Sequence, residues 1–357
     1  MISFIKQKLY PSVSKFVSRT TLVEGRLKGG SSSFKCLVVG NSPFTEYLKA
    51  RMYDEPPVVL QRRRIWIPSL KKLLCSKTDT FDLCIAVLPK AYESTFHGLY
   101  DYKCTEEVQQ VIDTSGSWED VRSRFSSTKR KVSNRVTERY GLGYRISTDV
   151  EEFDYFYHRM FVPHIKKRFG ELSAIDSYDE MKEFFLKGRL LFVTKGSEAV
   201  AGALSLVEDG TLIFRRTGVL DGDETHIEGG GQQALYYFQL KYANEHNLRA
   251  VDTMMSAPFL NDGVYINKRE WGATVMPDTK SQTWVYFFHA TPSEKTARFF
   301  ENNPTIVHSD KGLKGIIGVS NDMEISIAAI NDLTRRYQAR GIEGFTIVTR
   351  TGALSAP

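Results

Sequence analysis

The alternation of hydrophobic and polar residues is clearest in the middle of the chain, where it predicts two amphipathic helices. A capping box from Thr148 to Glu151 marks the start of the first helix. The apolar residues after it lie at i, i+3, i+4, i+7 and i+8, which places them on one helical face: Phe153, Phe156, Tyr157, Met160 and Phe161. A second capping box, Ser177 to Glu180, starts a helix that ends at Gly188.

Three apolar runs separated by short glycine-containing turns follow the second helix. They predict an antiparallel meander with strands at residues 190–194, 199–207 and 211–220. The run Gly229 to Gly231 then leads into a predicted helix at 232–244. A strand at 250–255, a loop at 258–268 and a last strand at 283–288 complete this region.

The flanking segments predict three further parts of the chain. Residues 1–33 are interpreted as an N-terminal segment that ends in a Gly- and Ser-rich linker at 22–33. Strand-like runs at 34–39, 81–88 and 107–112 predict an N-terminal α/β lobe over residues 34–117. A strand, helix and strand at 315–319, 325–340 and 344–349 predict a β-α-β extension over residues 291–357, which leaves 118–290 as the central domain.

Composition indicates a folded chain and a weak preference for anionic partners. Hydrophobic residues make up 41% and charged residues 25% of the 357 residues, which is typical of globular proteins rather than disordered ones. The net charge of +6 suits a nucleotide, a CoA phosphate, tRNA or a membrane surface, and does not choose among them. No stretch has the length and apolarity of a membrane span or of a signal peptide, so we predict a cytoplasmic protein.

The cysteines and histidines do not predict a metal site. All four cysteines lie in the first third of the chain and none forms a C-x-x-C pair. Cys36 and Cys84 stand in apolar runs, where cysteine is typically a small buried hydrophobic residue. We therefore expect a reducing compartment and no bound metal.

Basic residues concentrate in two segments, each with two interpretations. Gln61-Arg-Arg-Arg64 and Lys71-Lys72 flank Ile65-Trp66-Ile67, and a solvated face is favoured there over a nucleic-acid contact. Residues 122–145 hold eight basic residues and one acidic residue. Spacing of three to four residues predicts a helix from about Ser127 with one packed side: Phe125, Lys129, Val132, Val136 and Tyr140. The other side carries Arg130, Lys131, Arg135 and Arg139, either as a charged outer face or as a cradle for phosphate or carboxylate.

The order of helices, meander, glycine turn, helix, strand and loop resembles the GNAT acyltransferase fold. In that family the turn after the fourth strand binds the pyrophosphate of acyl-CoA through backbone amides, with a Q/R-x-x-G-x-G/A pattern. His226-Ile-Glu-Gly229-Gly-Gly231 matches this pattern with His in the first position. The resemblance implies an α/β (α+β) class with a mixed, mostly antiparallel central sheet.

Residues 118–290 further resemble the FemAB-like (CelD/BcsL-type) branch of GNAT proteins. The segments that carry this resemblance are Ser127 to Arg135 ending at Gly141, Gly188-Arg-Leu-Leu, Ala201-Gly202, Asp262-Gly-Val-Tyr-Ile-Asn-Lys268 and Trp271-Gly-Ala. Members of this branch use either acyl-CoA or aminoacyl-tRNA as the donor. Fem-type tRNA users often carry a long helical hairpin, and the sequence has no such charged helical pair, which favours acyl-CoA.

The resemblance also implies a donor site at the glycine turn. Backbone amides of Gly229, Gly230 and Gly231 and the helix that begins at Gln232 would hold the donor phosphates, because a helix start presents unpaired N–H groups to an anion. Glycine is alternatively explained as a turn residue with positive φ. His226 is a candidate phosphate contact and Glu228 a candidate base, with solvated turn residues as the alternative.

Candidate residues for acyl transfer lie on the neighbouring segments. Tyr265 is the candidate general acid, with a packed aromatic as the alternative. Asp262 is a candidate base, although a role in holding the loop is favoured. Lys268 is a candidate for binding an acceptor phosphate or carboxylate, with an exposed ion-paired lysine as the alternative. Further substrate contacts are predicted for three arginines of the strand and the basic helix: Arg215, Arg216 and Arg135.

These patterns predict an N-acyltransferase that moves an acyl group from acyl-CoA directly to an amine. No G-x-S-x-G elbow and no cysteine lies near the glycine turn, so a covalent acyl-enzyme is not favoured. The acceptor is expected to be a small amine from an envelope, polysaccharide or amino-acid-derived metabolite, and no DNA partner is expected. The alternatives are aminoacyl-tRNA-dependent peptide-bond formation on an envelope precursor and a non-catalytic GNAT-fold binding module.

Overall fold

The computed structural model describes residues 16–76, 80–170, 175–320 and 326–356. The chain forms two compact units. The first comprises the described residues up to Val108, Met255–Ile266 and those from Val275 onward, and the second comprises Gln109–Met254 and Asn267–Thr274. The class is mixed α/β with mostly antiparallel sheets, as predicted. No helix in the described ranges is long and apolar enough to cross a membrane.

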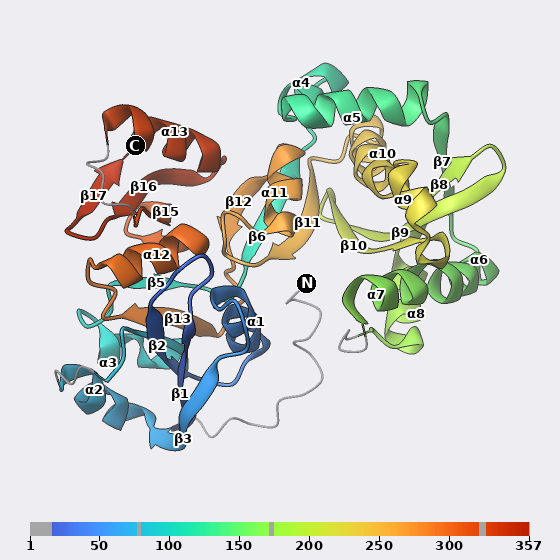
Figure 1. Ribbon diagram of the computed structural model, residues 1–357. Helices are drawn as coiled ribbons and strands as arrows, with labels where there is room; N and C mark the ends of the chain where they lie inside the picture. The colour runs from blue at the N-terminus through green and yellow to red at the C-terminus, as the bar shows by residue number, and fades with distance from the viewer. Residues whose placement is uncertain (1–15, 77–79, 171–174, 321–325, 357) are drawn as a thin grey trace. The chain divides into compact units, whose positions relative to one another are not determined.

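The first unit contains a six-stranded sheet of order β3-β1-β2-β4-β13-β5 (Figure 1). One face packs on α1 and α12, and the other face on α2 and α3. β2 and β4 are parallel, and the other strand pairs of this sheet in the described ranges are antiparallel. The elements of this sheet and its faces are β1 (Val17–Arg26), β2 (Ser33–Val39), α1 (Pro43–Met52), β3 (Val58–Trp66), α2 (Ile67–Cys75), β4 (Leu83–Pro89), η2 (Lys90–Tyr92), α3 (Glu93–Phe96), β5 (Tyr102–Cys104), β13 (Thr283–Phe288) and α12 (Glu294–Asn302).

Two segments of this sheet differ from the sequence prediction. Residues 22–26, interpreted as part of a linker, form the second half of β1, because Val23 is fully buried against the helices on that face. The predicted strand at 283–288 exists as β13, but it pairs with β4 and β5 rather than with the meander of the predicted domain 118–290. Buried Cys36, Cys84 and Cys104 are free thiols in this unit, which confirms the packing interpretation of Cys36 and Cys84.

A four-stranded sheet of order β14-β15-β16-β17 completes the first unit. β15 and β16 are parallel and joined by α13, so the predicted β-α-β extension is confirmed. Two antiparallel strands flank it, β14 on one side and β17 on the other. The bounds are β14 (Thr305–Ser309), β15 (Gly312–Gly318), α13 (Ile327–Tyr337), β16 (Ile342–Val348) and β17 (Ala353–Ala356).

The second unit is built on strands in the order β6-β11-β10-β9-β8-β7. The predicted meander is confirmed as β8, β9 and β10, which pair antiparallel in sequence order. α5 and α10 cover one face, and α6, η3 and α8 cover the other (Figure 1). The strand bounds are β6 (Val108–Asp113), β7 (Leu142–Ser147), β8 (Arg189–Lys195), β9 (Glu198–Glu208), β10 (Thr211–Val219) and β11 (Ala250–Ser256).

One of the two predicted capping boxes of the second unit is confirmed, and the other start is shifted by one residue. Ser177 caps α8 with a complete capping box, whereas Asp149, not the predicted Thr148, caps α6, because the Asp149 side chain accepts from the N–H of Glu151. The first amphipathic helix does not end at Pro163; it continues through a π-helical segment, η3, into α7, with Pro163 in the first turn of α7, where proline is tolerated. The helices are α4 (Trp118–Ser123), α5 (Ser127–Glu138), α6 (Val150–Tyr155), η3 (Phe156–Phe161), α7 (Val162–Phe169), α8 (Tyr178–Lys187), η5 (Leu220–Gly222), α9 (Glu224–Glu228) and α10 (Gly231–Glu245).

The predicted loop at 258–268 contains a helix. α11 spans Gly263–Glu270 and precedes β12 (Thr274–Pro277). Asp262 starts this helix, because its Oδ1 accepts hydrogen bonds from the N–H groups of Val264 and Tyr265. The prediction failed here because two polar residues precede a short helix that begins with glycine and has a weak apolar pattern.

A buried histidine on α7 predicts that acid destabilises the protein. His164 is 3% exposed; burial and the nearby charge of Arg168 lower the pKa of its imidazole to about 4. The unfolded chain binds this proton with a pKa near 6.5, so stability falls as the pH falls from about 6.5 towards 4, by at most about 2 kcal/mol at pH 5. Urea unfolding near pH 7 and pH 5 measures this loss. His164→Gln should reduce the pH dependence, and an unchanged pH dependence would contradict the prediction.

Candidate active site

The parallel strands β10 and β11 are paired over only three residues each. The pairs are Thr211↔Ala250, Leu212↔Val251 and Ile213↔Asp252. Beyond them, β10 has a register shift against β9 between Phe214 and Arg216. Both strands continue towards their carboxyl ends without pairing to each other. Ligands of α/β proteins commonly bind outside the carboxyl ends of neighbouring parallel strands.

β11 is kinked directly after its paired segment. Met254 has a φ of 65°, a left-handed conformation that is uncommon for residues other than glycine. Its N–H donates to the Oδ1 of Asp252 at 2.8 Å, which stabilises the kink. Backbone strain of this kind often lies at functional sites.

Lys268 meets β11 at this kink. Its side chain is 4% exposed, and its Nζ donates to the carbonyl oxygen of Met254 at 3.1 Å. Lys268 is therefore buried, whereas the sequence-based alternative was an exposed lysine. It lies on the second half of α11, which holds the side chain against the end of β11.

The glycine turn starts α10 as predicted. Gly230 has a φ of 87°, and α10 begins at Gly231 without a hydrogen bond from a capping side chain. The first N–H groups of an α-helix have no acceptor within the helix, and a helix of 15 residues places positive partial charge at this end. The first turn of α10 is therefore suited to an anion.

Packing requires small residues throughout the glycine turn. A Cβ on Gly230 would lie 2.8 Å from the ring of Tyr140. A Cβ would lie 3.0 Å from the carbonyl oxygen of Thr225 at Gly229, and 2.9 Å from that of His226 at Gly231. Close packing thus accounts for all three glycines, and a positive φ for Gly230 alone.

The polar residues beside the glycine turn are accessible. His226 and Gln232 are half-buried, and Glu228 is exposed at the end of the short helix α9. Among the described residues, no ion pair involves Glu228. Arg135 lies on the exposed side of α5. These four side chains stay candidates for contacts with substrate.

The two arginines of β10 have different surroundings. Arg216 is 5% exposed and forms an ion pair with Asp176, and its Nη1 donates to the carbonyl oxygen of Arg215 at 3.0 Å. Burial lowers the pKa of Arg216. Arg215 is half-buried, and its guanidinium lies 4.8 Å from the centre of the Phe184 ring. The charge of Arg216 is thus already balanced by a carboxylate.

Tyr265 and Asp262 belong to the first unit. Tyr265 is fully buried in an apolar cluster with Leu260 and Val275. Asp262 holds the start of α11 through Oδ1, and its Oδ2 accepts from the hydroxyl of Tyr47 at 2.6 Å. Burial and this carboxylate raise the pKa of Tyr47 to about 12. The contacts of Asp262 are those of the favoured loop-holding role. The other predicted site residues lie in the second unit.

Lys129 is a buried cation near the glycine turn and was not among the predicted site residues. Its Nζ lies 2.7 Å from the amide oxygens of both Gln233 and Asn267 and 3.6 Å from a carboxylate oxygen of Glu270. Burial lowers the pKa of its ammonium. The sequence did indicate that Lys129 is buried, because Lys129 is one of the residues on the packed side of the predicted helix. It ties α5 and the second half of α11 to the first turn of α10.

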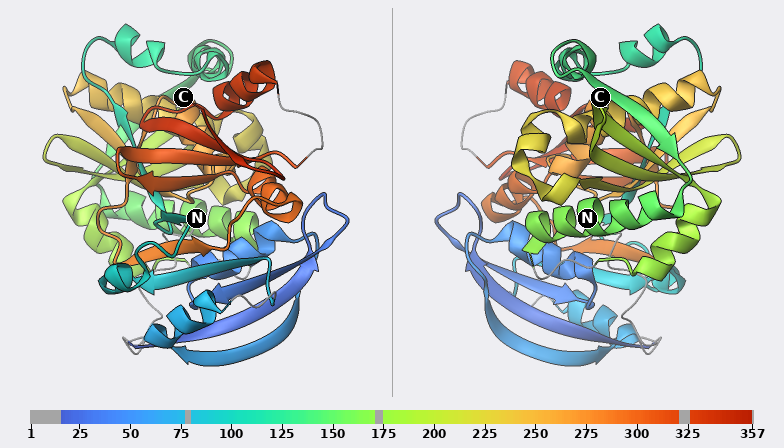
Figure 2. Two further views of the ribbon diagram at one scale, coloured as in Figure 1. Left: turned by 90° about the vertical axis from the view of Figure 1, so that its left-hand side faces the viewer. Right: turned by 90° about the vertical axis from the view of Figure 1, so that its right-hand side faces the viewer.

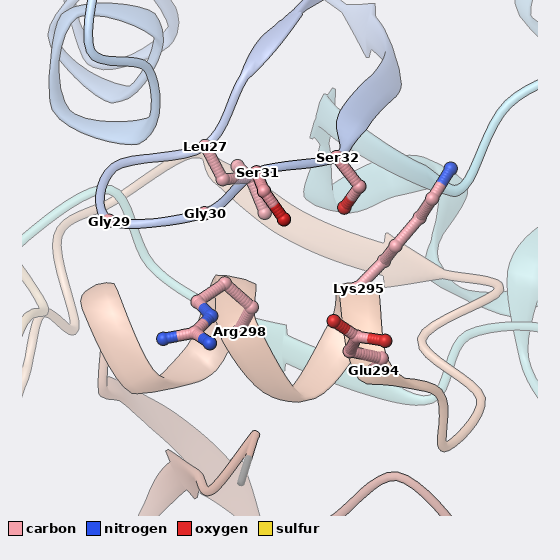
Figure 3. Close-up of a pocket in the computed structure, with 8 residues that line it drawn as sticks. All are labelled: Leu27, Gly29, Gly30, Ser31, Ser32, Glu294, Lys295 and Arg298. Carbon is pink, nitrogen blue, oxygen red and sulfur yellow. The ribbon is translucent and has the colours of Figure 1, made fainter.

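Two cavities of about 280 Å³ each occur in the first unit, and neither is lined by a predicted site residue. The more polar one lies between the loop that joins β1 to β2 and the helix α12 (Figure 3). Its charged side chains already form ion pairs: Lys295 with Asp82, Arg298 with Glu301, and Glu294 with Arg350. The charge in this cavity is therefore balanced by neighbouring side chains.

No family model and no curated protein sequence matches the chain. Similar solved structures include FemX, with 12% identity over 78% of this chain and 87% of that chain and a TM-score of 0.39. L-PGS from Bacillus licheniformis has 12% identity over 74% of this chain and 83% of that chain and a TM-score of 0.36. A GCN5-related N-acetyltransferase from Anabaena variabilis has 10% identity over 80% of this chain and 61% of that chain and a TM-score of 0.28.

Proposed function

We propose that the protein is an N-acyltransferase that moves an acyl group from acyl-CoA to an amine. The observation that carries the proposal is the end of pairing between β10 and β11 after Ile213 and Asp252, directly before a kink that a buried lysine contacts. Strand edges that face each other without pairing offer main-chain groups to the amide-containing arm of a CoA thioester. The first turn of α10 would bind the phosphates of the donor.

The chemistry requires an attacking amine and stabilisation of the negative charge that forms on the carbonyl oxygen. The neutral amine attacks the thioester carbon, the C–N bond forms, and the tetrahedral intermediate collapses as the C–S bond breaks. The amine proton leaves through a base, and the thiolate takes a proton to give free CoA. Lys268 is a buried cation that would stabilise the oxyanion. For the transfer of the amine proton we retain Glu228, in the second unit, as the base.

A second donor, aminoacyl-tRNA, is favoured by the basic side of α5. Lys131, Arg135 and Arg139 are exposed on this helix, which packs against α10. A cationic helix face beside an anion-binding helix start also suits a polyanion. Binding of RNA would lose affinity steeply as salt rises, because several phosphates would release counterions together. Binding of CoA would change much less.

Two substitutions of opposite charge at Gln232 test the donor site. Gln232→Glu places a negative charge in the first turn of α10, so acetyl-CoA should bind about fivefold more weakly; Gln232→Lys should bind it about fivefold more tightly. The substitutions leave the glycine turn intact, and glutamate in a first turn favours the helix, so weaker binding would not reflect unfolding. Calorimetric titration with acetyl-CoA and longer acyl-CoAs measures the effect, with helix content by circular dichroism as the control.

The outcomes separate the three candidate functions. Absence of binding to every acyl-CoA, or equal affinities for both variants, would reject the acyl-CoA proposal. Salt-sensitive binding of aminoacyl-tRNA under the same conditions would then support the second donor. Acyl-CoA binding without release of thiol in the presence of a panel of primary amines would favour a binding module without catalysis.

A further inference from the structure

The edge strand β3 exposes an unusual combination of side chains. β3 is the outermost strand of the six-stranded sheet (Figure 2), and all its residues except Ile65 are exposed. Val58, Leu60 and Trp66 have exposed fractions of 66%, 46% and 56%. Phe16 lies beside the end of the strand, because the N–H of Ile67 donates to its carbonyl oxygen at 2.8 Å. We call Phe16, Arg19 and residues 58–66 the β3 stripe.

Arginines occupy the middle of the β3 stripe. The register with β1 pairs Arg64 with Arg19 and Trp66 with Val17, so two cations and the tryptophan share one face, together with Arg62. Within the described ranges, no acidic side chain forms an ion pair with Arg62, Arg63 or Arg64. Aliphatic residues lie at one end of the stripe, aromatic residues at the other, and uncompensated positive charge between them.

The charge of the β3 stripe requires an anionic occupant. A second copy of this chain would bring an identical positive stripe, and residues 1–15 contain three lysines and no acidic residue, so neither neutralises the arginines. Nucleic acid would supply phosphates, but its backbone and base edges offer no hydrocarbon interior for Val58, Val59 and Leu60. An anionic lipid surface supplies both, with phosphates at the level of the arginines and acyl chains below them.

We propose that the β3 stripe binds the surface of membranes that contain anionic phospholipids. Trp66 and Phe16 would enter the interface region, where aromatic side chains are favoured. The aliphatic side chains at the other end, Val58, Val59 and Leu60, would enter the boundary between the headgroups and the acyl chains. The arginines would contact lipid phosphates. This peripheral contact is independent of the acyl-transfer proposal. It also explains why an edge strand, which proteins usually protect with charge alone, carries exposed aliphatic and aromatic residues as well.

Co-sedimentation of the full chain with vesicles tests the proposal. Binding to vesicles of phosphatidylcholine with phosphatidylglycerol should exceed binding to phosphatidylcholine alone and should weaken as salt rises. The double substitution Arg62→Gln with Arg64→Gln should weaken binding roughly 25-fold, about fivefold for each charge. Leu60→Ser with Trp66→Ser should weaken it about tenfold or more. The matched control, Arg335→Gln with Arg336→Gln on α13, removes the same charge from another surface and should bind as the unsubstituted protein does.

The proposal fails if the protein does not bind anionic vesicles, or if the control variant loses as much binding as the β3 variants. In that case the arginines protect the sheet edge only. It also fails if an RNA oligonucleotide binds as tightly as the vesicles and the Leu60→Ser, Trp66→Ser variant keeps that RNA binding, since nucleic acid would then be the partner. Unchanged circular dichroism of each variant establishes that the changes arise at the surface.

Discussion

Replacing Asp176 with alanine is expected to lower the free energy of unfolding by about 3–5 kcal/mol, because it leaves the buried guanidinium of Arg216 without this carboxylate. Arg216 is 5% exposed on β10, and its Nε donates to Asp176. Arginine stays protonated in proteins, so it cannot escape the cost of burial by losing its proton. Urea unfolding followed by circular dichroism measures the change.

Asp179→Ala is the matched control for this prediction. Asp179 is exposed in the first turn of α8, close in sequence to Asp176. Its loss removes the same charge but costs only about 0.3–1 kcal/mol of interaction with the helix dipole. Equal destabilisation by the two substitutions would mean that the Asp176–Arg216 pair contributes no more than an ordinary surface charge. A double variant, Asp176→Leu with Arg216→Leu, should recover part of the loss because it removes the buried charge together with its partner carboxylate.

Gly218→Ala is expected to destabilise the protein by about 3 kcal/mol or more. A Cβ at Gly218 would lie 2.5 Å from the backbone carbon of Met160 and 2.6 Å from the backbone nitrogen of Phe161. These atoms belong to the π-helical segment η3, so neither can move without shifting the helix that covers β10. Thermal unfolding should show a large decrease in the melting temperature.

Gly263→Ala provides the control for the glycine prediction. No heavy atom lies within 4 Å of a Cβ built at Gly263, and its φ is not positive. Alanine there should be neutral or stabilise by up to about 1 kcal/mol, because it reduces the freedom of the unfolded chain. A small effect at both positions would show that η3 can move away from β10, contrary to the packing described above.

These stability effects decide how the proposed donor site can be tested. Gly218 and Arg216 lie on the part of β10 that does not pair with β11, so their substitution changes the strand itself as well as any bound ligand. A substitution at Gly230 would likewise change the local structure as well as any ligand binding, since the positive φ of Gly230 and the ring of Tyr140 exclude a side chain. Gln232 carries neither constraint, and substitutions there therefore report on ligand charge.

Local patterns predicted most elements of the fold. The meander, the capped helix α8, the glycine turn with α10, and the C-terminal β-α-β unit all lie where the sequence placed them. Each depends on residues a few positions apart: a turn glycine, a capping serine, or apolar spacing of 2 or 3.6 residues. The donor site at the glycine turn came from the resemblance to GNAT proteins, and the glycine turn and Lys268 flank β11 in the sequence.

Contacts between distant residues decided the rest. The sequence did not show that residues 22–26 continue a strand, that β13 joins the sheet of β4, or that α11 forms within the predicted loop. The sequence also could not predict that Arg216 pairs with Asp176, 40 positions away, or that buried Lys129 contacts Gln233, 104 positions away. Whether a charged side chain faces water or a buried partner depends on what the folded chain brings beside it. The sequence by itself determined the elements and the residue types near the site, and tertiary packing determined which of those charges are already balanced.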